Sequence, residues 1–261
     1  MAVRTGLSTS AFYGKWETEE AAAVISRLPV DCAEVFLQTS SEYSREFARI
    51  VRENLKGVPC TSIHPLGTVF ENALISRSAR QRSDAFDVLR RVLDAGCALG
   101  AKAYVYHGRN TPRNEVLPWN LQLNADMLGP MCEEAAQRGM VIAWENVCWC
   151  QLTVPERARE AREALKDVRF TLDIKQAMKA GCNPIDFVQA MGDRLINVHV
   201  CDWDAQGKLC LPGEGTFDFA GLACALLAVG YSGPVVIEPY LALIKSDEAL
   251  ERSIRYIKEI T

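Results

Sequence analysis

The sequence lacks the marks of several protein classes. Its ten cysteines include no C-x-x-C pair, so neither a disulfide framework nor a zinc ribbon is expected. There is no P-loop or G-x-G-x-x-G pattern for nucleotide phosphates, and no Ser/His/Asp arrangement stands out. We interpret most cysteines as small buried hydrophobic residues, because they lie mostly in apolar segments, as do Cys32, Cys60, Cys97, Cys132 and Cys224.

Long apolar runs and an excess of positive charge are also missing. The longest apolar block, Leu222 to Val229, is too short to span a bilayer, and the N-terminal residues contain no signal-peptide core. The formal net charge is −4, and the basic residues are spread along the chain, which argues against a nucleic-acid surface. We therefore expect a cytoplasmic protein with no membrane and no nucleic-acid partner, and a homo-oligomer is compatible with the sequence.

The chain has enough apolar residues for a large core. Hydrophobic residues make up 49% of the 261 residues, and no Pro/Gly/Ser-rich linker divides them, which favours one domain over residues 1–261. Short β-rich runs alternate with longer helical patterns, as is typical of βα units around a parallel sheet. We predict eight strands, near residues 3–9, 32–38, 60–64, 103–107, 141–146, 169–173, 195–200 and 235–238.

Three helix starts are marked by capping patterns. Thr153 and Asn183 each offer a capping side chain close to a proline, which favours the first turn of a helix. Ser246 is followed by two acidic residues, which suit the positive end of a helix.

Polar residues end six of the eight predicted strands, and they include all three histidines of the chain. In a closed barrel these strand ends meet at one rim, where active sites are built, whereas an open doubly wound sheet would scatter them. We therefore predict the α/β class and a single (β/α)8 TIM barrel. The six residues are His64, His107, Glu145, Asp173, His199 and Glu238.

Four of these residues form a candidate metal site. Three carboxylates and one imidazole suit one divalent cation, such as Mn²⁺, Mg²⁺, Co²⁺ or Fe²⁺, and Zn²⁺ also fits. Each carboxylate has a simpler alternative: Glu145 could accept a backbone amide, Asp173 could cap the next helix, and Glu238 could pair with a basic residue. With a cation bound to them and to His199, the two glutamates could exchange a proton with a substrate as acid and base.

Six segments of the chain resemble the xylose isomerase-like TIM barrels and follow one another in the order found in that family. That superfamily holds sugar-phosphate isomerases and epimerases, ketose 3-epimerases, inosose dehydratases and apurinic endonucleases. The resemblance covers nearly the whole chain and implies the barrel fold more strongly than any one reaction. The segments are Cys97–Gly108, Trp144–Asn146, Leu172–Ala177, Asn197–Asp202, Leu211–Phe219 and Gly233–Glu238.

The resemblance implies that Glu145, Asp173, His199 and Glu238 bind a single metal ion, and that the two glutamates serve as acid and base. It also implies that His64 and His107 are substrate-pocket residues.

Two departures bear on the reaction. Gln176 stands where the family usually has a histidine, and its amide can still hydrogen-bond to a sugar hydroxyl. Lys208 and Cys210 stand where the endonucleases supply an aspartate and a histidine, so a three-metal cluster is not expected.

Three further residues are candidates for substrate contact. Arg109 and Lys208 could bind a phosphate or carboxylate, although solvated loop charges look the same in a sequence. Trp203 could stack on a sugar face, although aromatic packing would also explain it.

These features predict a divalent-metal-dependent isomerase or epimerase of a small carbohydrate, which moves a proton through an enediolate. The alternatives are a dehydratase or lyase acting on an inositol-like ketone, an apurinic endonuclease, and a barrel that binds a ligand without catalysis.

Overall fold

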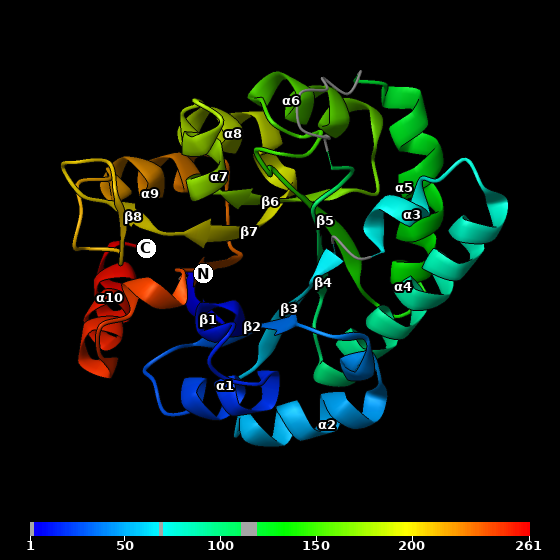
Figure 1. Cartoon of the computed structure of the whole chain (residues 1–261). Coiled ribbons are helices and arrows are strands. Elements are labelled where there is room, and N and C mark those ends of the chain that lie inside the picture. Colours follow the sequence, from blue (N-terminus) through cyan, green and yellow to red (C-terminus); the bar gives the residue numbers. More distant parts are fainter. Residues whose placement is uncertain (1–2, 68–69, 111–118) are drawn as a thin grey trace.

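Eight parallel strands close into a barrel in the computed structural model, which describes residues 3–67, 70–110 and 119–261. The predicted (β/α)8 TIM barrel is confirmed, and every predicted strand agrees with the observed one within one residue at each end. Figure 1 shows the barrel surrounded by helices. The strands are β1 (Arg4–Ser8), β2 (Cys32–Leu37), β3 (Cys60–Pro65), β4 (Ala103–Tyr106), β5 (Val141–Glu145), β6 (Arg169–Asp173), β7 (Leu195–Val200) and β10 (Pro234–Ile237).

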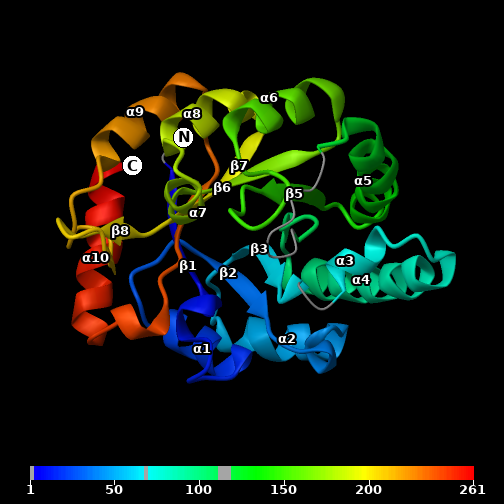
Figure 2. The same cartoon turned by 45° about the horizontal axis from the view of Figure 1, so that its top comes forward.

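The helices cover the outside of the barrel, as the tilted view in Figure 2 makes plain. Their apolar faces pack on the strands and leave polar faces to solvent. Within the described residues, none of these helices combines the length and apolar character needed to cross a bilayer. They are α1 (Thr18–Ile25), α2 (Arg45–Asn54), α3 (Glu71–Leu74), α4 (Ala79–Leu99), α5 (Leu121–Ala136), α6 (Pro155–Ala164), α7 (Ile174–Lys179), α8 (Pro184–Met191), α9 (Phe219–Ala228) and α10 (Asp247–Ile260).

Two of the three predicted helix caps are confirmed. The Asn183 side chain accepts a hydrogen bond from the Ile185 amide at the start of α8, and Ser246 does the same for Ala249 in α10. The prediction for Thr153 is wrong, because α6 begins at its proline and the preceding residue, a valine, occupies the cap position. The Thr153 hydroxyl accepts instead from the guanidinium of Arg157.

A two-stranded antiparallel hairpin, β8 (Asp202–Trp203) with β9 (Leu209–Cys210), follows β7 and is absent from the prediction. The buried Asp202 carboxylate organises the loop after the hairpin. It accepts backbone N–H groups from Gly213, Gly215 and Phe217 at 3.0, 3.1 and 3.0 Å. Gly215 has no room for a Cβ, which would collide with the Asp202 side chain.

All ten cysteines are free thiols. The prediction of buried cysteines holds for Cys32, Cys60 and Cys132. It is wrong for Cys97 and Cys224, which are exposed, because an apolar segment of a helix can still turn one small residue outward.

Candidate metal centre and active site

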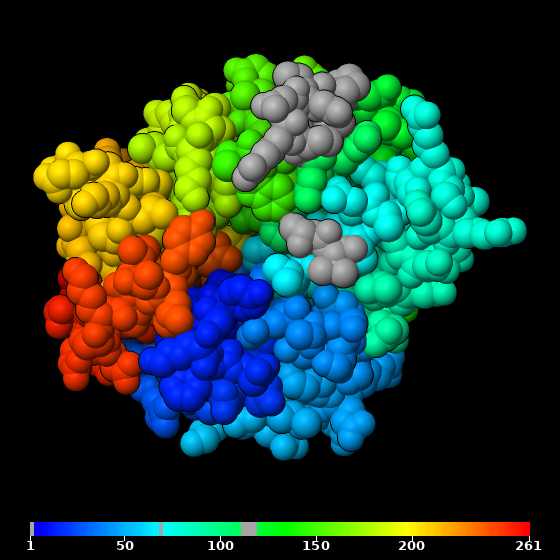
Figure 3. Space-filling model, viewed as in Figure 1, coloured from blue at the N-terminus to red at the C-terminus, as the bar shows by residue number. Residues whose placement is uncertain are grey.

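The six polar residues at the strand ends converge at one end of the barrel, as predicted. Five of them line a cavity of about 280 Å³, and His199 lies fully buried beneath it. In Figure 3, segments coloured from blue to orange meet around the centre of this face. The five lining residues are His64, His107, Glu145, Asp173 and Glu238.

His199 lies at the centre of the cluster. Its Nδ1 atom is 3.0 Å from Glu145 Oε1 and 3.4 Å from Glu238 Oε2. Its Nε2 atom is 3.0 Å from Oε2 of Glu34. An ionised carboxylate can only accept hydrogen bonds. This contact assigns a proton to Nε2 and aims Nδ1 at Glu145 and Glu238.

Carboxylates also determine the charge of His199. Burial opposes the charged imidazolium, but Glu34 and Glu238 outweigh that effect and raise the pKa of His199 well above its ordinary value. The metal-free imidazole therefore holds a proton on both nitrogens at neutral pH. A cation that binds Nδ1 must displace that proton.

The donor set fits one divalent cation. Ligand atoms of Glu145, Asp173, His199 and Glu238 all lie within 4.8 Å of one another, and all four residues are buried. Three buried carboxylates so close together repel one another unless positive charge lies between them. Mostly oxygen donors with one imidazole match the preferences of Mn²⁺, Mg²⁺, Co²⁺, Fe²⁺ or Zn²⁺.

Asp173 serves as a helix cap and is also placed to bind a cation. One carboxylate oxygen, Oδ1, accepts the Gln176 amide at 3.0 Å and caps α7, which was the simpler alternative from the sequence. The other oxygen, Oδ2, points to Lys175, whose Nζ lies 3.4 Å away. Burial raises the pKa of Asp173 above its ordinary value.

Lys175 is a site residue that the sequence analysis missed. It is only 5% exposed, and its Nζ lies 3.2 Å from Glu238 Oε2 and 5.0 Å from the centre of the Tyr240 ring. Burial opposes its charge, but Asp173 and Glu238 raise the pKa of Lys175 well above its ordinary value. The signal in the sequence was a lysine two residues after a strand-end carboxylate, in the first turn of a helix.

Glu34 was missed as well. It is fully buried inside the barrel, where Ser62 donates to its Oε2 at 2.7 Å and Asn197 donates at 3.1 Å. Burial opposes its ionisation, but His199 and His64 hold the pKa of Glu34 well below its ordinary value. A charged residue within an otherwise apolar strand was the available signal, because a bare buried charge is very costly.

The other two histidines form a chain at the cavity wall. His64 Nε2 and His107 Nε2 are 2.7 Å apart, and His107 Nδ1 lies 3.2 Å from Oε2 of the buried Glu71. If His107 donates from Nδ1 to Glu71, its Nε2 accepts from His64. Burial opposes charge on His64, but Glu238, Glu34 and Glu145 raise its pKa to about 10, so it can donate from both nitrogens.

The predicted substrate residues divide into two groups. Gln176 lines the cavity, and its side-chain oxygen accepts the Cys148 amide at 3.3 Å. Arg109, Lys208 and Trp203 are described residues that do not line this cavity. Arg109 lines a separate cleft of about 1230 Å³ beside α3 and α4.

Lys208 and Trp203 belong to the hairpin region after β7. Lys208 is exposed in the hairpin turn, and its backbone amide donates to Asp204. The Trp203 ring packs on Phe217, with 5.9 Å between ring centres. Aromatic packing, the simpler alternative for Trp203, is therefore what its surroundings show.

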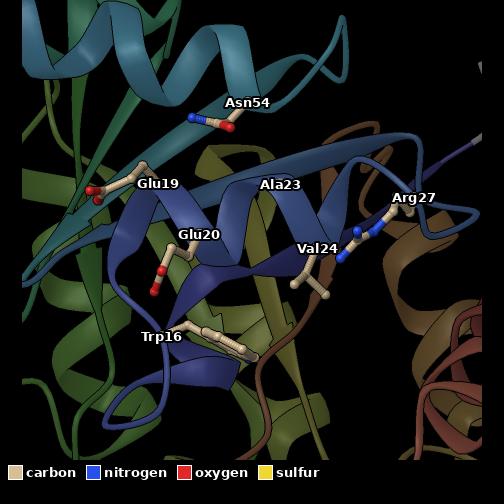
Figure 4. Close-up of a pocket in the computed structure, with 7 residues that line it drawn as sticks. All are labelled: Trp16, Glu19, Glu20, Ala23, Val24, Arg27 and Asn54. Atoms are coloured by element: carbon tan, nitrogen blue, oxygen red, sulfur yellow. The ribbon is translucent and has the colours of Figure 1, made fainter.

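A recess on the outside of the barrel has different chemistry. Figure 4 shows it along α1, with Asn54 of α2 on its far side. It has a volume of about 270 Å³ and is lined by two glutamates and one arginine, without histidine or cysteine. The cluster around His199 is therefore the stronger candidate for a metal centre.

The model of one protein family matches residues 22–260: the xylose isomerase-like TIM barrel. Curated relatives include two proteins named 3-dehydroshikimate dehydratase. The protein from Pseudomonas aeruginosa is 32% identical over 133 residues, which are 45% of this chain and 20% of that protein. The protein from Pseudomonas putida is 29% identical over 130 residues, with the same coverage, so the match spans only about a fifth of either relative.

Solved structures of sugar epimerases share the fold over their full length. A 3-keto-D-glucoside 4-epimerase from E. coli has a TM-score of 0.75 at 22% identity, covering 98% of this chain and 99% of that chain. A D-allulose 3-epimerase from Methylomonas sp., in complex with D-allulose, has a TM-score of 0.80 at 18% identity, covering 100% and 98%. At these identities the likeness establishes the barrel and not the reaction.

Proposed function

This chain belongs to the xylose isomerase-like TIM barrel family, and from that premise we propose that it is a divalent-metal-dependent isomerase or epimerase of a small sugar or sugar derivative. The observation that carries the proposal is the convergence of Glu145 and Glu238 on His199 Nδ1, at 3.0 and 3.4 Å, beside a cavity of about 280 Å³. Two carboxylates at one imidazole nitrogen provide both a cation site and a pair of proton carriers.

We assign the cation to Glu145, Asp173, His199 and Glu238. When bound, a divalent cation would polarise a substrate carbonyl and make the adjacent C–H more acidic. Mn²⁺, Mg²⁺, Co²⁺, Fe²⁺ and Zn²⁺ all suit this donor set.

The two glutamates carry the proton in this proposal. Burial opposes the ionisation of Glu145, but His199 and His64 hold its pKa below the ordinary value, so Glu145 is an ionised carboxylate. Glu145 ends β5, whereas Glu238 follows β10, and two other strands lie between these in the barrel. The two carboxylates thus reach the cavity from different sides, as removal and return of a proton on different faces of a substrate require.

The remaining cavity residues would hold the sugar. His64, His107 and Gln176 present hydrogen-bonding groups at the wall, and Ser10 lies beside Glu238, with 3.3 Å between Ser10 Oγ and Glu238 Oε1. Such groups can recognise several hydroxyls at once. The cytoplasmic location, and substrate contacts by Arg109, Lys208 and Trp203, stay predictions from the sequence.

A dehydratase is the second candidate, and the two dehydratase relatives over 45% of this chain favour it. The same proton removal beside a carbonyl would then be followed by loss of a hydroxyl group as water. The apurinic endonuclease and the non-catalytic barrel have no comparable support.

Product analysis separates the two candidates. Metal-free protein is loaded with Mn²⁺ and incubated with a panel of ketoses, ketose phosphates and cyclic polyol ketones, and the products are followed by mass spectrometry and NMR. An isomerase or epimerase gives products of unchanged mass, whereas a dehydratase gives products that have lost water. If the metal-loaded protein changes no member of the panel and binds no cation, the proposal fails.

A further inference from the structure

We propose that the Lys175 ammonium is a built-in competitor of the divalent cation: it neutralises the ligand carboxylates in the metal-free protein and weakens metal binding. The inference rests on the proposed metal site and concerns a residue outside the ligand set. Its starting point is the place of the ammonium, 3.2 Å from Glu238 Oε2 and 3.4 Å from Asp173 Oδ2.

The Lys175 ammonium contacts the same oxygen of Glu238 that faces His199. Glu238 Oε2 is the oxygen that lies 3.4 Å from His199 Nδ1, whereas Glu238 Oε1 contacts Ser10 and His64. In Asp173, Oδ1 is committed to the cap of α7, so Oδ2 is the oxygen left for a cation. In both Asp173 and Glu238, Lys175 therefore contacts the oxygen to which a cation would bind.

The buried position of Lys175 limits where its ammonium can move. This lysine is the second residue of α7, two positions after Asp173, and only 6% of its side chain is exposed. The Tyr240 ring lies 5.0 Å from its Nζ and offers an alternative place for the charge at the cavity mouth. A bound divalent cation would therefore share the site with a positive charge or push it toward Tyr240.

Charge balance indicates the direction of the effect. Three ligand carboxylates carry three negative charges, and before any metal binds, the protonated His199 and the Lys175 ammonium each offset one of them. Like charges a few ångströms apart in a buried site repel strongly, so the ammonium reduces the gain from cation binding. The same ion pairs stabilise the metal-free protein.

The test measures Mn²⁺ binding to metal-free protein by titration calorimetry. Lys175→Met shortens the side chain by one atom and removes its charge, and we expect Mn²⁺ to bind at least about tenfold more tightly than to wild type. Lys175→Arg keeps the charge and should bind no more tightly than wild type. Lys179→Met removes an exposed lysine whose Nζ donates to the Tyr240 hydroxyl at 3.0 Å. This control variant should bind Mn²⁺ as tightly as wild type does.

The thermal unfolding midpoint of the metal-free proteins gives a second readout. It should fall in Lys175→Met and recover when Mn²⁺ is added, because the cation takes over the neutralising role. Lys175→Gln replaces Lys175→Met in both measurements if the methionine variant does not fold.

The outcomes separate this inference from the proposed function. If wild type binds Mn²⁺ and the uncharged variant binds it equally or more weakly, Lys175 is no competitor, and the proposed metal site stands. If neither protein binds Mn²⁺, both the inference and the proposed metal site are overturned. Binding by the uncharged variant alone would support the competition most strongly.

Discussion

Glu34 on β2 and His199 on β7 meet inside the barrel, with 3.0 Å between Glu34 Oε2 and His199 Nε2. These residues are 165 positions apart in the chain and come from strands that are not neighbours in the barrel. Their contact fixes the orientation of the imidazole, so that Nδ1 faces Glu145. A residue outside the proposed ligand set thus positions a ligand.

Replacing Glu34 with glutamine should weaken Mn²⁺ binding by about ten- to a hundredfold, the usual cost of losing such a supporting contact. The amide has no negative charge to attract the protonated His199 Nε2, and its NH₂ group, in place of Oε1, would face His64 Nδ1, which lies 3.4 Å from Oε1 in wild type. Titration calorimetry measures the change. Glu19→Gln, on the outer recess along α1, is the matched control and should bind as wild type does. Unchanged affinity in Glu34→Gln would refute the positioning role.

The two roles of Asp173 can be separated by mutation. Asn caps helices about as well as Asp, so Asp173→Asn should keep α7 capped while losing a charged ligand. We expect its Mn²⁺ affinity to fall steeply, and the free energy of unfolding of the metal-free protein to fall only through loss of the ion pair with Lys175. Asp173→Ala should lose about 1 kcal/mol more of that free energy, because the Gln176 amide loses its acceptor. Equal stability of the two variants would contradict the cap.

Asp202 should stabilise the fold far more than its neighbour Asp204. The Asp202 carboxylate is buried and accepts three backbone N–H groups of the following loop, whereas Asp204 lies in the more exposed hairpin turn. We expect Asp202→Asn to cost about 2 kcal/mol of unfolding free energy, because its amide group leaves buried N–H donors unpaired. Asp204→Asn should cost less than about 1 kcal/mol. Urea unfolding compares them, and similar losses would contradict this account.

The cysteines should react with a thiol reagent in an order set by exposure. Cys97 and Cys224 are exposed and should be labelled first in the native protein. Burial raises the pKa of the Cys132 thiol to about 12, so this residue should resist labelling until the protein unfolds. Peptide mass spectrometry after brief treatment identifies the labelled sites. Early labelling of Cys132, or none at Cys97, would contradict the fold at those helices.

The sequence was sufficient to predict the barrel and the convergence of its strand ends. Polar residues such as Glu145 and His199 come at regular places after apolar runs, and parallel strands in a closed barrel bring those places to one rim. The strands can be predicted because the pattern of apolar residues that marks them is local. Once the strands are known, the barrel topology alone brings the polar residues at their ends close together.

Contacts made by longer side chains could not be predicted in this way. Glu34 lies within a strand, and nothing local shows that it meets His199 across the barrel. The reach of Lys175 back to Glu238 depends on the direction in which α7 leaves β6. Trp203 has an aromatic neighbour, Phe217, only because the loop folds around Asp202. Each of these contacts depends on how the barrel closes or on the path of a loop, and residue spacing determines neither.

Glu145 has two roles in the proposed mechanism: it binds the cation and transfers a proton. The decisive measurement is solvent-deuterium incorporation into ketose substrates by the Mn²⁺-loaded protein, followed by NMR in D₂O. Glu145→Gln and Glu238→Gln are compared with wild type, and Glu19→Gln serves as the control.

We expect wild type and Glu19→Gln to place deuterium on the carbon beside the carbonyl. Each of the two site variants should lose this exchange by a factor of about a hundred or more, the usual contribution of a positioned acid or base. If Glu145→Gln exchanges deuterium as fast as wild type, the proton-transfer role assigned to Glu145 is wrong.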